Sequence, residues 1–304
     1  MGELHYFLEI QVTRIDDSGL LMTQSKYVKD LLVKAGMNGC KYCSTPLSLS
    51  LNIQAIGGAE LDNPHLYRLV VKNLQYLTVT RLDLTFSVNK LAQFMQALLE
   101  SHWKLVKRIL CYVSGAATYG HKLSKDPSMK ITTYCNPDWA CDPSDRKSIG
   151  GFCVYVGRNL VSWHSKKQGV VARSSTKAEY RALADLVAEL IWIKGLIEEL
   201  KWPVQEAPMA YCDNQRTMFL AENPILHLKT KHFEIDLHFV RDYVTSKVIQ
   251  VSHVPNSVQI VDTFTKALPS TAFLHLRDKL KVQNLENSAP LSLRGHDRGY
   301  NKDM

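Results

Sequence analysis

A long amphipathic helix near the middle of the chain constrains the fold more than any other feature. At 100° per residue, five aliphatic side chains that follow Ser174 share one face, namely Leu183, Leu186, Leu190, Ile193 and Ile197. A stripe of this length must be buried, and the segments around it read as short strands. The pattern therefore predicts a helix that packs against a β-sheet.

A carboxylate lies on this buried face. Glu179 falls near the centre of the stripe, one turn before Leu183. Burying it costs free energy unless a cation meets it, and a metal ion would do so. The alternative is a capping box from Thr176 to Glu179, in which the glutamate binds the helix backbone. The helix by itself leaves both interpretations open.

Two more acidic residues stand at the ends of predicted elements. Asp213 follows a strand and opens a helix, so it could be a simple N-cap. Asp262 begins a C-terminal helix, where its charge would interact favourably with the helix dipole. Together with Glu179, however, they predict carboxylates that converge on one edge of a sheet. Clustered carboxylates repel one another, and a divalent cation is the usual reason for such a cluster.

The remaining pattern predicts an N-terminal hairpin, a helical region and then alternating strands and helices. The predicted strands are 4–12, 20–23, 130–135, 151–157, 159–165, 208–212 and 248–254. The predicted helices are 25–35, 64–79, 83–97, 100–113, 176–200, 213–222 and 231–246. Residues 44–63 are poor in charge and are predicted to be a linker, and the polar residues after 283 are predicted to be disordered.

Composition excludes some classes of protein. No apolar run of about 18 residues exists, so no membrane association is expected. The first residues lack the features of a signal peptide, and the seven cysteines are odd in number and scattered. We therefore expect reduced thiols and an intracellular protein of the cytoplasm or nucleus. Cys40 and Cys43 form a lone C-x-x-C without a second pair, so zinc is not expected there.

Basic residues are unevenly distributed. The formal net charge is +8, and no acidic residue occurs between Asp145 and Glu179. That interval carries Arg146, Lys147, Arg158, Lys166, Lys167, Arg173 and Lys177, and a second cluster comprises Lys104, Lys107 and Arg108. This distribution suits a nucleic-acid backbone. A solvated surface is the alternative, and charge alone does not decide between them.

Nine segments carry a resemblance to a known family. They are GELHYFLEIQV, LMTQSKYVKDLL, LQYLTVTRLDLTFSVN, SHWKLVKRILCYVSG, DRKSIGGFCVYVG, LVSWHSKKQ, RSSTKAEYRAL, TKHFEIDLHFVRD and VDTFTKALP. In this order, over residues 2–283, they resemble the C-terminal part of copia-type LTR-retrotransposon Pol polyproteins.

The resemblance implies an α/β (α+β overall) fold in four parts. Residues 1–61 would be a reverse-transcriptase palm-end hairpin and linker, and 62–129 a helical thumb and connection remnant. Residues 130–283 would form a ribonuclease H-like mixed five-stranded sheet with flanking helices, followed by a disordered tail at 284–304. The hairpin is expected to lack its sheet neighbours. The Tyr-x-Asp-Asp motif of the polymerase is absent, so no polymerase activity is expected.

The family's ribonuclease H uses four acids to hold two Mg²⁺ ions, with Mn²⁺ as a substitute, and cleaves RNA in RNA–DNA hybrids. Glu179, Asp213 and Asp262 match three of these acids, and His253 matches a mobile histidine that helps product release. The fourth acid is missing, because Asn136 occupies its place in YCNPDWA (134–140).

Asn136 offers one carbonyl oxygen but no charge, and it cannot bridge two cations. Changes to residues that only support the metal ligands lower metal affinity or activity by about 10–100-fold. We expect Asn136, at a position that would contact the metal directly, to lower metal affinity and turnover by at least as much. Asp138 shares the strand face, but it lies about 6–7 Å along the strand, so it is a poor substitute. Two functions remain open: an impaired hybrid endoribonuclease, and a non-enzymatic remnant that binds hybrid or duplex nucleic acid. Asn136 favours the second.

Overall fold

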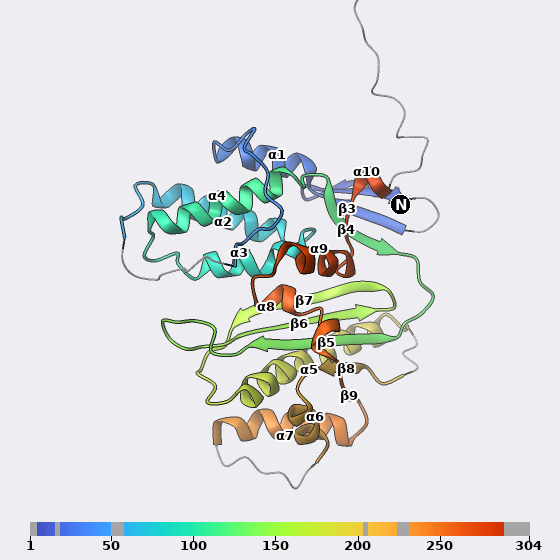
Figure 1. Ribbon diagram of the computed structural model, residues 1–304. Coiled ribbons are helices and arrows are strands. Elements are labelled where there is room, and N and C mark those ends of the chain that lie inside the picture. Colours follow the sequence, from blue (N-terminus) through green and yellow to red (C-terminus); the bar gives the residue numbers. More distant parts are fainter. Residues whose placement is uncertain (1–4, 16–18, 50–57, 203–205, 224–230, 289–304) are drawn as a thin grey trace, which may run out of the picture.

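Two five-stranded sheets organise the protein, and a group of helices flanks the first of them (Figure 1). The computed structural model describes residues 5–15, 19–49, 58–202, 206–223 and 231–288. The first sheet is antiparallel and has the order β1-β2-β3-β4-β10. Its strands are Tyr6–Phe7, Ile10–Ile15, Gly19–Thr23, Tyr119–Ser124 and Val282–Asn284 in that order.

This first sheet corrects one expectation. The N-terminal hairpin, β2 and β3, was expected to lack its sheet neighbours, but β3 pairs with β4 along its whole length. Strand β4 falls within the region expected to be helical, and β10 arrives from the far end of the chain. Segments more than 90 residues apart thus share one sheet, because hydrogen-bonding edges are paired wherever the chain supplies a partner.

The second sheet confirms the predicted mixed five-stranded arrangement, in the order β7-β6-β5-β8-β9. Strand β6 runs antiparallel to both of its neighbours, β5 and β7, whereas β8 and β9 run parallel to β5. In chain order these strands are Ile131–Asp138, Ile149–Val156, Asn159–Lys167, Met209–Cys212 and Gln250–His253. The carboxyl ends of β5, β8 and β9 therefore meet at one edge.

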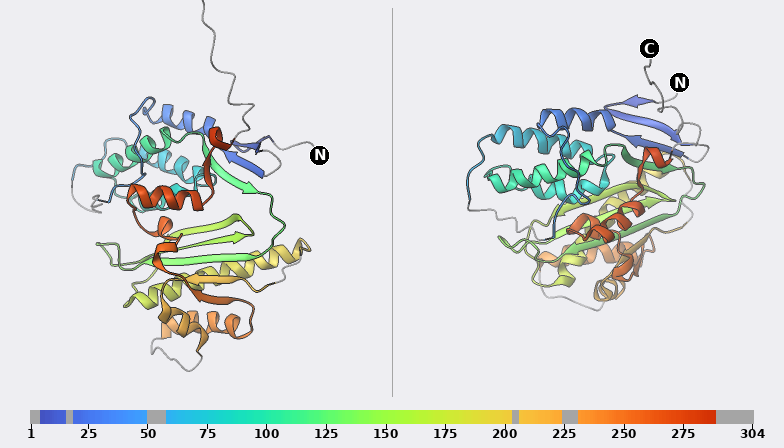
Figure 2. Two further views of the ribbon diagram at one scale, coloured as in Figure 1. Left: turned by 45° about the vertical axis from the view of Figure 1, so that its right-hand side comes forward. Right: turned by 45° about the horizontal axis from the view of Figure 1, so that its top comes forward.

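Helix α5 (Ser175–Glu199) covers one face of this second sheet, as the apolar stripe predicts. All five stripe residues are buried, and they pack against Ile131 and Cys135 of β5. Helices α6 (Gln215–Glu222) and α7 (Lys231–Thr245) lie against α5. The short helix α8 (Asp262–Thr265) covers the opposite face, so the sheet has helices on both sides (Figure 2).

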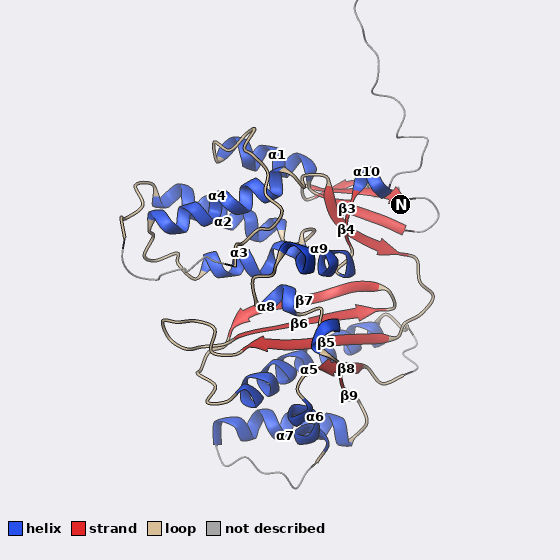
Figure 3. Ribbon diagram, viewed as in Figure 1, coloured by secondary structure: helices blue, strands red, loops and turns tan. Residues whose placement is uncertain are grey.

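The helical group packs around a second apolar core. It comprises α1 (Ser25–Lys34), α2 (Pro64–Leu77), α3 (Thr85–Ala92), α4 (Glu100–Ser114) and, before α3, a 3₁₀ turn at Leu82–Leu84 (Figure 3). The described parts of the predicted linker 44–63 are not loose, since Leu47 and Leu61 are buried in this core. Helix α9 (Ser270–Lys279) joins the group through Phe273, which packs edge-on against Tyr112.

The end of the described chain also departs from the prediction. Helix α10 (Leu285–Ser288) follows β10 directly, so the first residues of the predicted disordered tail form regular structure. Residues 289–304 lie outside the described part. No helix in the described residues is both long and apolar enough to cross a membrane.

Candidate active site

Asn136 lies near the carboxyl end of β5, at the edge where the parallel strands end. It is 5% exposed and stands opposite Gly151 of β6. Its side-chain nitrogen Nδ2 donates a hydrogen bond of 2.7 Å to Oδ1 of Asp262. Two residues that are 126 positions apart are thus in direct contact.

Asp262 is brought there because α8 packs closely on the sheet. A Cβ atom on Gly151 would lie 2.9 Å from Cγ2 of Thr265, so the absent side chain makes room for α8. Buried Gln259 fixes the approach to this helix: its Nε2 donates to the Cys135 carbonyl (3.1 Å). Neither Gly151 nor Gln259 was predicted to matter, and no local sequence pattern distinguishes them.

Lys266 is a further residue that the sequence analysis missed. Its Nζ lies 2.9 Å from Oδ1 of Asp262, in an i,i+4 ion pair. That spacing is the signal that could have revealed it. The same carboxylate oxygen therefore faces both the Asn136 amide and the Lys266 ammonium group.

Glu179 is 8% exposed on α5, and its Oε2 atom has no hydrogen-bond partner among the described residues. The N-cap of α5 is Ser174, whose side chain accepts from Lys177 N. Glu179 therefore lies beyond the N3 position, and the capping-box interpretation is wrong. Burial, and then the negative charge of Asp213, raise the pKa of Glu179 to about 9.

Asp213 directly follows β8, as predicted, but it is not the N-cap of the next helix. Asn214 caps α6, because its side chain accepts from two backbone N–H groups of the first turn. Burial raises the pKa of Asp213, and the charge of Asp262 raises it further. His253 ends β9 beside it, since Cys212 and His253 are register partners, and its charge acts in the opposite direction.

Asp138 is the last residue of β5 and lies at the same edge. Burial raises its pKa and the charge of Lys266 lowers it, while the charge of Asp262 raises it. Asp138 thus lies within the field of the cluster. The hydrogen bond to Asp262, however, is made by Asn136.

The negative charges of Asp213 and Asp262 raise the pKa of Glu179, and the charge of Asp262 raises that of Asp213, so this edge is short of positive charge. The unpartnered Oε2 of buried Glu179 is an open oxygen donor of the kind that Mg²⁺ binds. The donor set therefore fits a divalent cation. As the side chains stand in the described structure, no group of three or more His, Cys, Asp or Glu residues is arranged to hold a metal.

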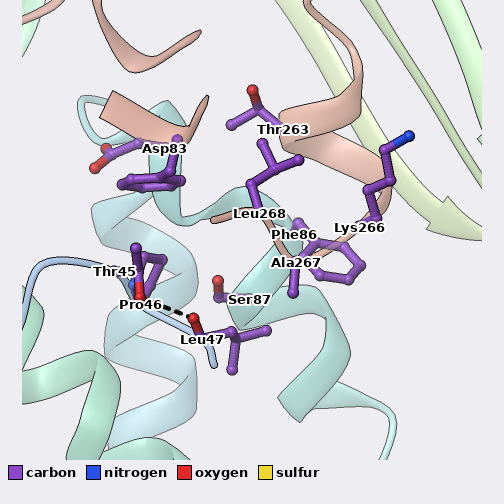
Figure 4. Close-up of a pocket in the computed structure, with 11 residues that line it drawn as sticks. Thr45, Pro46, Leu47, Asp83, Phe86, Ser87, Thr263, Lys266, Ala267 and Leu268 are labelled. Carbon is purple, nitrogen blue, oxygen red and sulfur yellow. Dashed lines mark hydrogen bonds between the residues drawn. The ribbon is translucent and has the colours of Figure 1, made fainter. Parts of the chain in front are cut away.

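A cavity that Thr263 and Lys266 help to line is too small for a substrate. It has a volume of about 10 Å³ and lies between residues 45–47, α3 and the α8–α9 connection. Such a volume admits about one water molecule. Figure 4 shows Lys266 at its border, with the ammonium group directed away from the other lining side chains.

The predicted nucleic-acid-binding residues lie in two separate places. Arg146, Lys147, Lys166, Lys167 and Arg173 belong to the second sheet and its loops, and Lys104, Lys107 and Arg108 to α4. Lys166 and Arg173 are exposed. Lys167 instead contacts Asp142 (2.7 Å) and Asp145 (2.9 Å).

Arg108 also bonds within the chain: it donates from Nη2 to Thr45 Oγ1 at 3.0 Å. Lys104 is exposed on the same helix. The two basic clusters lie on different parts of the fold, one on α4 of the helical group and the other on the second sheet (Figure 1). Their contact with nucleic acid stays a prediction.

The fold and the site together define a class. A mixed sheet in this strand order, with helices on both faces and acidic residues at the carboxyl ends of its strands, is a ribonuclease H-like domain. Searches of solved structures found a ribonuclease H1 in complex with an RNA/DNA hybrid, with a TM-score of 0.34 and 13% identity over 43% of this chain and 88% of that one. The ribonuclease H1 of Halobacterium salinarum gave a TM-score of 0.32, also at 13% identity, over 48% of this chain and 98% of that one.

Sequence comparison shows the family. The chain is 41% identical over 286 residues to the retrovirus-related Pol polyprotein from transposon RE1 of Arabidopsis thaliana. The aligned residues make up 94% of this chain but 19% of that relative. It is 31% identical to the corresponding polyprotein from transposon TNT 1-94 of Nicotiana tabacum, over 90% of this chain and 21% of the relative. An uncharacterized mitochondrial protein of Arabidopsis thaliana is 43% identical over 63% of this chain and 79% of its own length.

The chain therefore belongs to the family of retrovirus-related Pol polyproteins of copia-type transposons. It spans about one fifth of the length of these polyproteins (19% for the RE1 relative). No protein-family model matches it.

Proposed function

We propose that this protein is a ribonuclease H-type endoribonuclease acting on RNA in RNA–DNA hybrids, with its activity weakened at one metal-ligand position. The observation that carries the proposal is the single edge at which Asn136, Glu179, Asp213 and Asp262 meet. Membership in the Pol polyprotein family supports it.

The roles are those that the family resemblance implies for these residues. Glu179, Asp213 and Asp262 would hold Mg²⁺, or Mn²⁺ in its place, with Asn136 offering only its amide oxygen. When bound, the metal would activate a water molecule and stabilise the leaving 3′ oxygen of the RNA. His253, beside Asp213, would assist departure of the product. Gln259 and Gly151 position Asp262, and they would not touch the substrate.

The weakening has a structural reason. A carboxylate in place of Asn136 would repel Asp262, and this pair would be stable only around a cation. The Asn136 amide instead donates to Asp262, and Lys266 neutralises the same oxygen. Oδ1 of Asp262 is therefore already occupied within the chain, so a metal ion must displace these two contacts in order to bind that oxygen.

The same observation favours a second candidate function, in which the domain binds hybrid or duplex nucleic acid and does not cleave it. Exposed Lys166, Arg173 and Lys104 would then contact phosphates. No polymerase activity is proposed, because the 304 residues contain no Tyr-x-Asp-Asp motif.

Cleavage of a labelled RNA–DNA hybrid tests the proposal, in Mg²⁺ and then in Mn²⁺. The native chain is compared with Asn136→Asp, and with Asn136→Asp combined with Asp213→Asn as the matched inactive control. We expect Asn136→Asp to raise turnover by at least about 10-fold and the double variant to lose it. Silence of the native chain and of Asn136→Asp, with folded circular dichroism spectra, would reject the enzyme in favour of the binding protein.

A further inference from the structure

A groove with a basic rim lies at the other end of the second sheet. Its described lining comes from the end of β4, the β4–β5 connection, the β6–β7 turn with the adjoining strand ends, and Trp202 just after α5, and its volume is about 1030 Å³. Met129 and Asn159, which line it, stand at the starts of β5 and β7, whereas Asn136 lies near the end of β5. Because a strand rises about 3.3 Å per residue, the groove is separated from the carboxylates by about 20–25 Å.

The walls of this groove are fixed by backbone contacts. Gly157 has a φ of +56° and donates from its N–H to the Lys130 carbonyl (2.9 Å). A Cβ on Gly157 would lie 2.5 Å from the Ser128 carbonyl oxygen, so the turn and the connection are tightly apposed. Asn159 bonds to both backbone groups of Ser124, accepting at 2.6 Å and donating at 2.9 Å. The β4–β5 connection and the β6–β7 turn are therefore fixed against each other, so these walls of the groove are preformed.

Positive charge dominates the rim. Lys122, Lys125 and Arg158 line the groove, and Asp126 is the one acidic residue among the described lining. Arg158 approaches Asp126 only to 3.8 Å, and its side chain is 78% exposed. An ion pair this exposed is weak, so Arg158 is free to contact a second anion.

An aromatic ring stands beside this charge. Trp202 is 55% exposed, and neighbouring Val161 is 45% exposed. The backbone of Trp202 is anchored to α5, because its N–H donates to the Ile197 carbonyl (3.1 Å) after Lys201 adopts a φ of +57°. A large, exposed aromatic ring on an anchored backbone, beside a basic groove, is suited to stack on a base. Its present exposure to water is unfavourable.

We propose that this groove binds single-stranded nucleic acid, with a base stacked on Trp202 and phosphates at Lys122, Lys125 and Arg158. Charge complementarity favours an anionic polymer, and the ring favours unpaired bases, because a duplex hides the faces of its bases. The inference goes beyond the proposed function and does not depend on cleavage. Such a site would hold a strand that extends away from the hybrid.

The test is binding of a fluorescently labelled 12-nucleotide oligothymidylate to the full chain, measured by anisotropy in EDTA at low salt. EDTA removes any metal-dependent reaction, so failure here and failure of the ribonuclease proposal are distinguishable. Trp202→Ala is compared with Trp192→Ala, a matched control on α5 that is 63% exposed outside the groove lining. We expect about a 10-fold weaker affinity for Trp202→Ala, from the loss of one stacked base, and no change for Trp192→Ala.

The contribution of the basic side chains is measured separately, by the salt dependence of the affinity. Lys125→Ala and Arg158→Ala should each weaken binding and reduce the slope of log affinity against log salt by about 0.7, as expected for one phosphate contact on a single strand. Equal affinities of the native chain and folded Trp202→Ala would overturn the proposal. Tighter binding of a blunt duplex, or full displacement of the oligonucleotide by an equal concentration of a polyglutamate peptide, would also overturn the assignment to single strands.

Discussion

His121 offers the sharpest test of how the two sheets are held together. It lies on β4, is 2% exposed, and its ring packs edge-on against Trp163 of β7, with centroids 6.0 Å apart. Neither ring nitrogen has a hydrogen-bond partner among the described residues. Burial therefore lowers the pKa of His121 to about 4.

The sign of the pH effect follows from the depressed pKa. Between about pH 6.5 and 4 the unfolded chain binds a proton at this position and the native chain does not, so stability falls as pH falls. With a folded pKa of about 4, the loss at pH 5 is about 2 kcal/mol relative to pH 7. For a chain of this size, that corresponds to a few degrees in Tm.

The perturbation is His121→Phe, which keeps an aromatic ring against Trp163 and removes the titrating group. Because no hydrogen bond is lost, we expect this variant to be more stable by about 1–2 kcal/mol at pH 7. Its advantage should grow by about 2 kcal/mol at pH 5. Urea unfolding at both pH values, followed by circular dichroism, measures the two differences.

Exposed His275 on α9 supplies the control, since His275→Gln removes a histidine from solvent and should leave the pH dependence of the native chain unchanged. The reasoning is refuted if His121→Phe is destabilised by the same amount at both pH values. That result would mean that the imidazole has a partner and does not titrate on unfolding.

Three other predictions concern the packing of the chain. Asp83→Asn leaves the buried Arg81 guanidinium without the carboxylate that is now 2.9 Å away. The free energy of unfolding, measured in urea, should fall by about 3–5 kcal/mol. A loss below about 1 kcal/mol would contradict the inference that this ion pair is shielded from water. Gly151→Ala places a methyl group 2.9 Å from Thr265 Cγ2 and should lower the free energy of unfolding by about 1–3 kcal/mol. It should also lower hybrid cleavage in the Asn136→Asp background. Gly169→Ala, whose added methyl group meets nothing within 4 Å, is the matched control. Burial, and then a hydrogen bond with the Cys40 side chain, raise the pKa of Cys111 to about 11. Iodoacetamide should therefore label Cys111 about 20-fold more slowly than free cysteine at pH 8. Peptide mass mapping measures the two rates, and equal rates would refute the raised pKa.

Periodicity predicted the regular elements well where they are long. The stripe on α5 specified its buried face, and the strands of the second sheet were placed within a few residues. The same local reasoning failed for short β4 and β10. Three to six residues carry too little pattern, and their pairing depends on partners far away in the sequence.

The candidate site was likewise predicted only in part by local sequence patterns. The sequence placed acids at the ends of elements, and the family resemblance told which position Asn136 replaces. Local reasoning left open whether Glu179 and Asp213 were caps, and the structure moved each cap to another residue, Ser174 and Asn214. Cap assignments shift easily, because several polar residues near a helix start compete for the same backbone groups.

The sequence by itself determined the long helices and the strands of the second sheet, which face of α5 is buried, and that one expected carboxylate is an amide. Only the tertiary structure decided that this amide and Lys266 both meet Asp262. The physical reason is that the separation of Asn136 and Asp262 is not a local property of the chain. It is set by how closely α8 packs on the sheet, which depends on a missing side chain at Gly151.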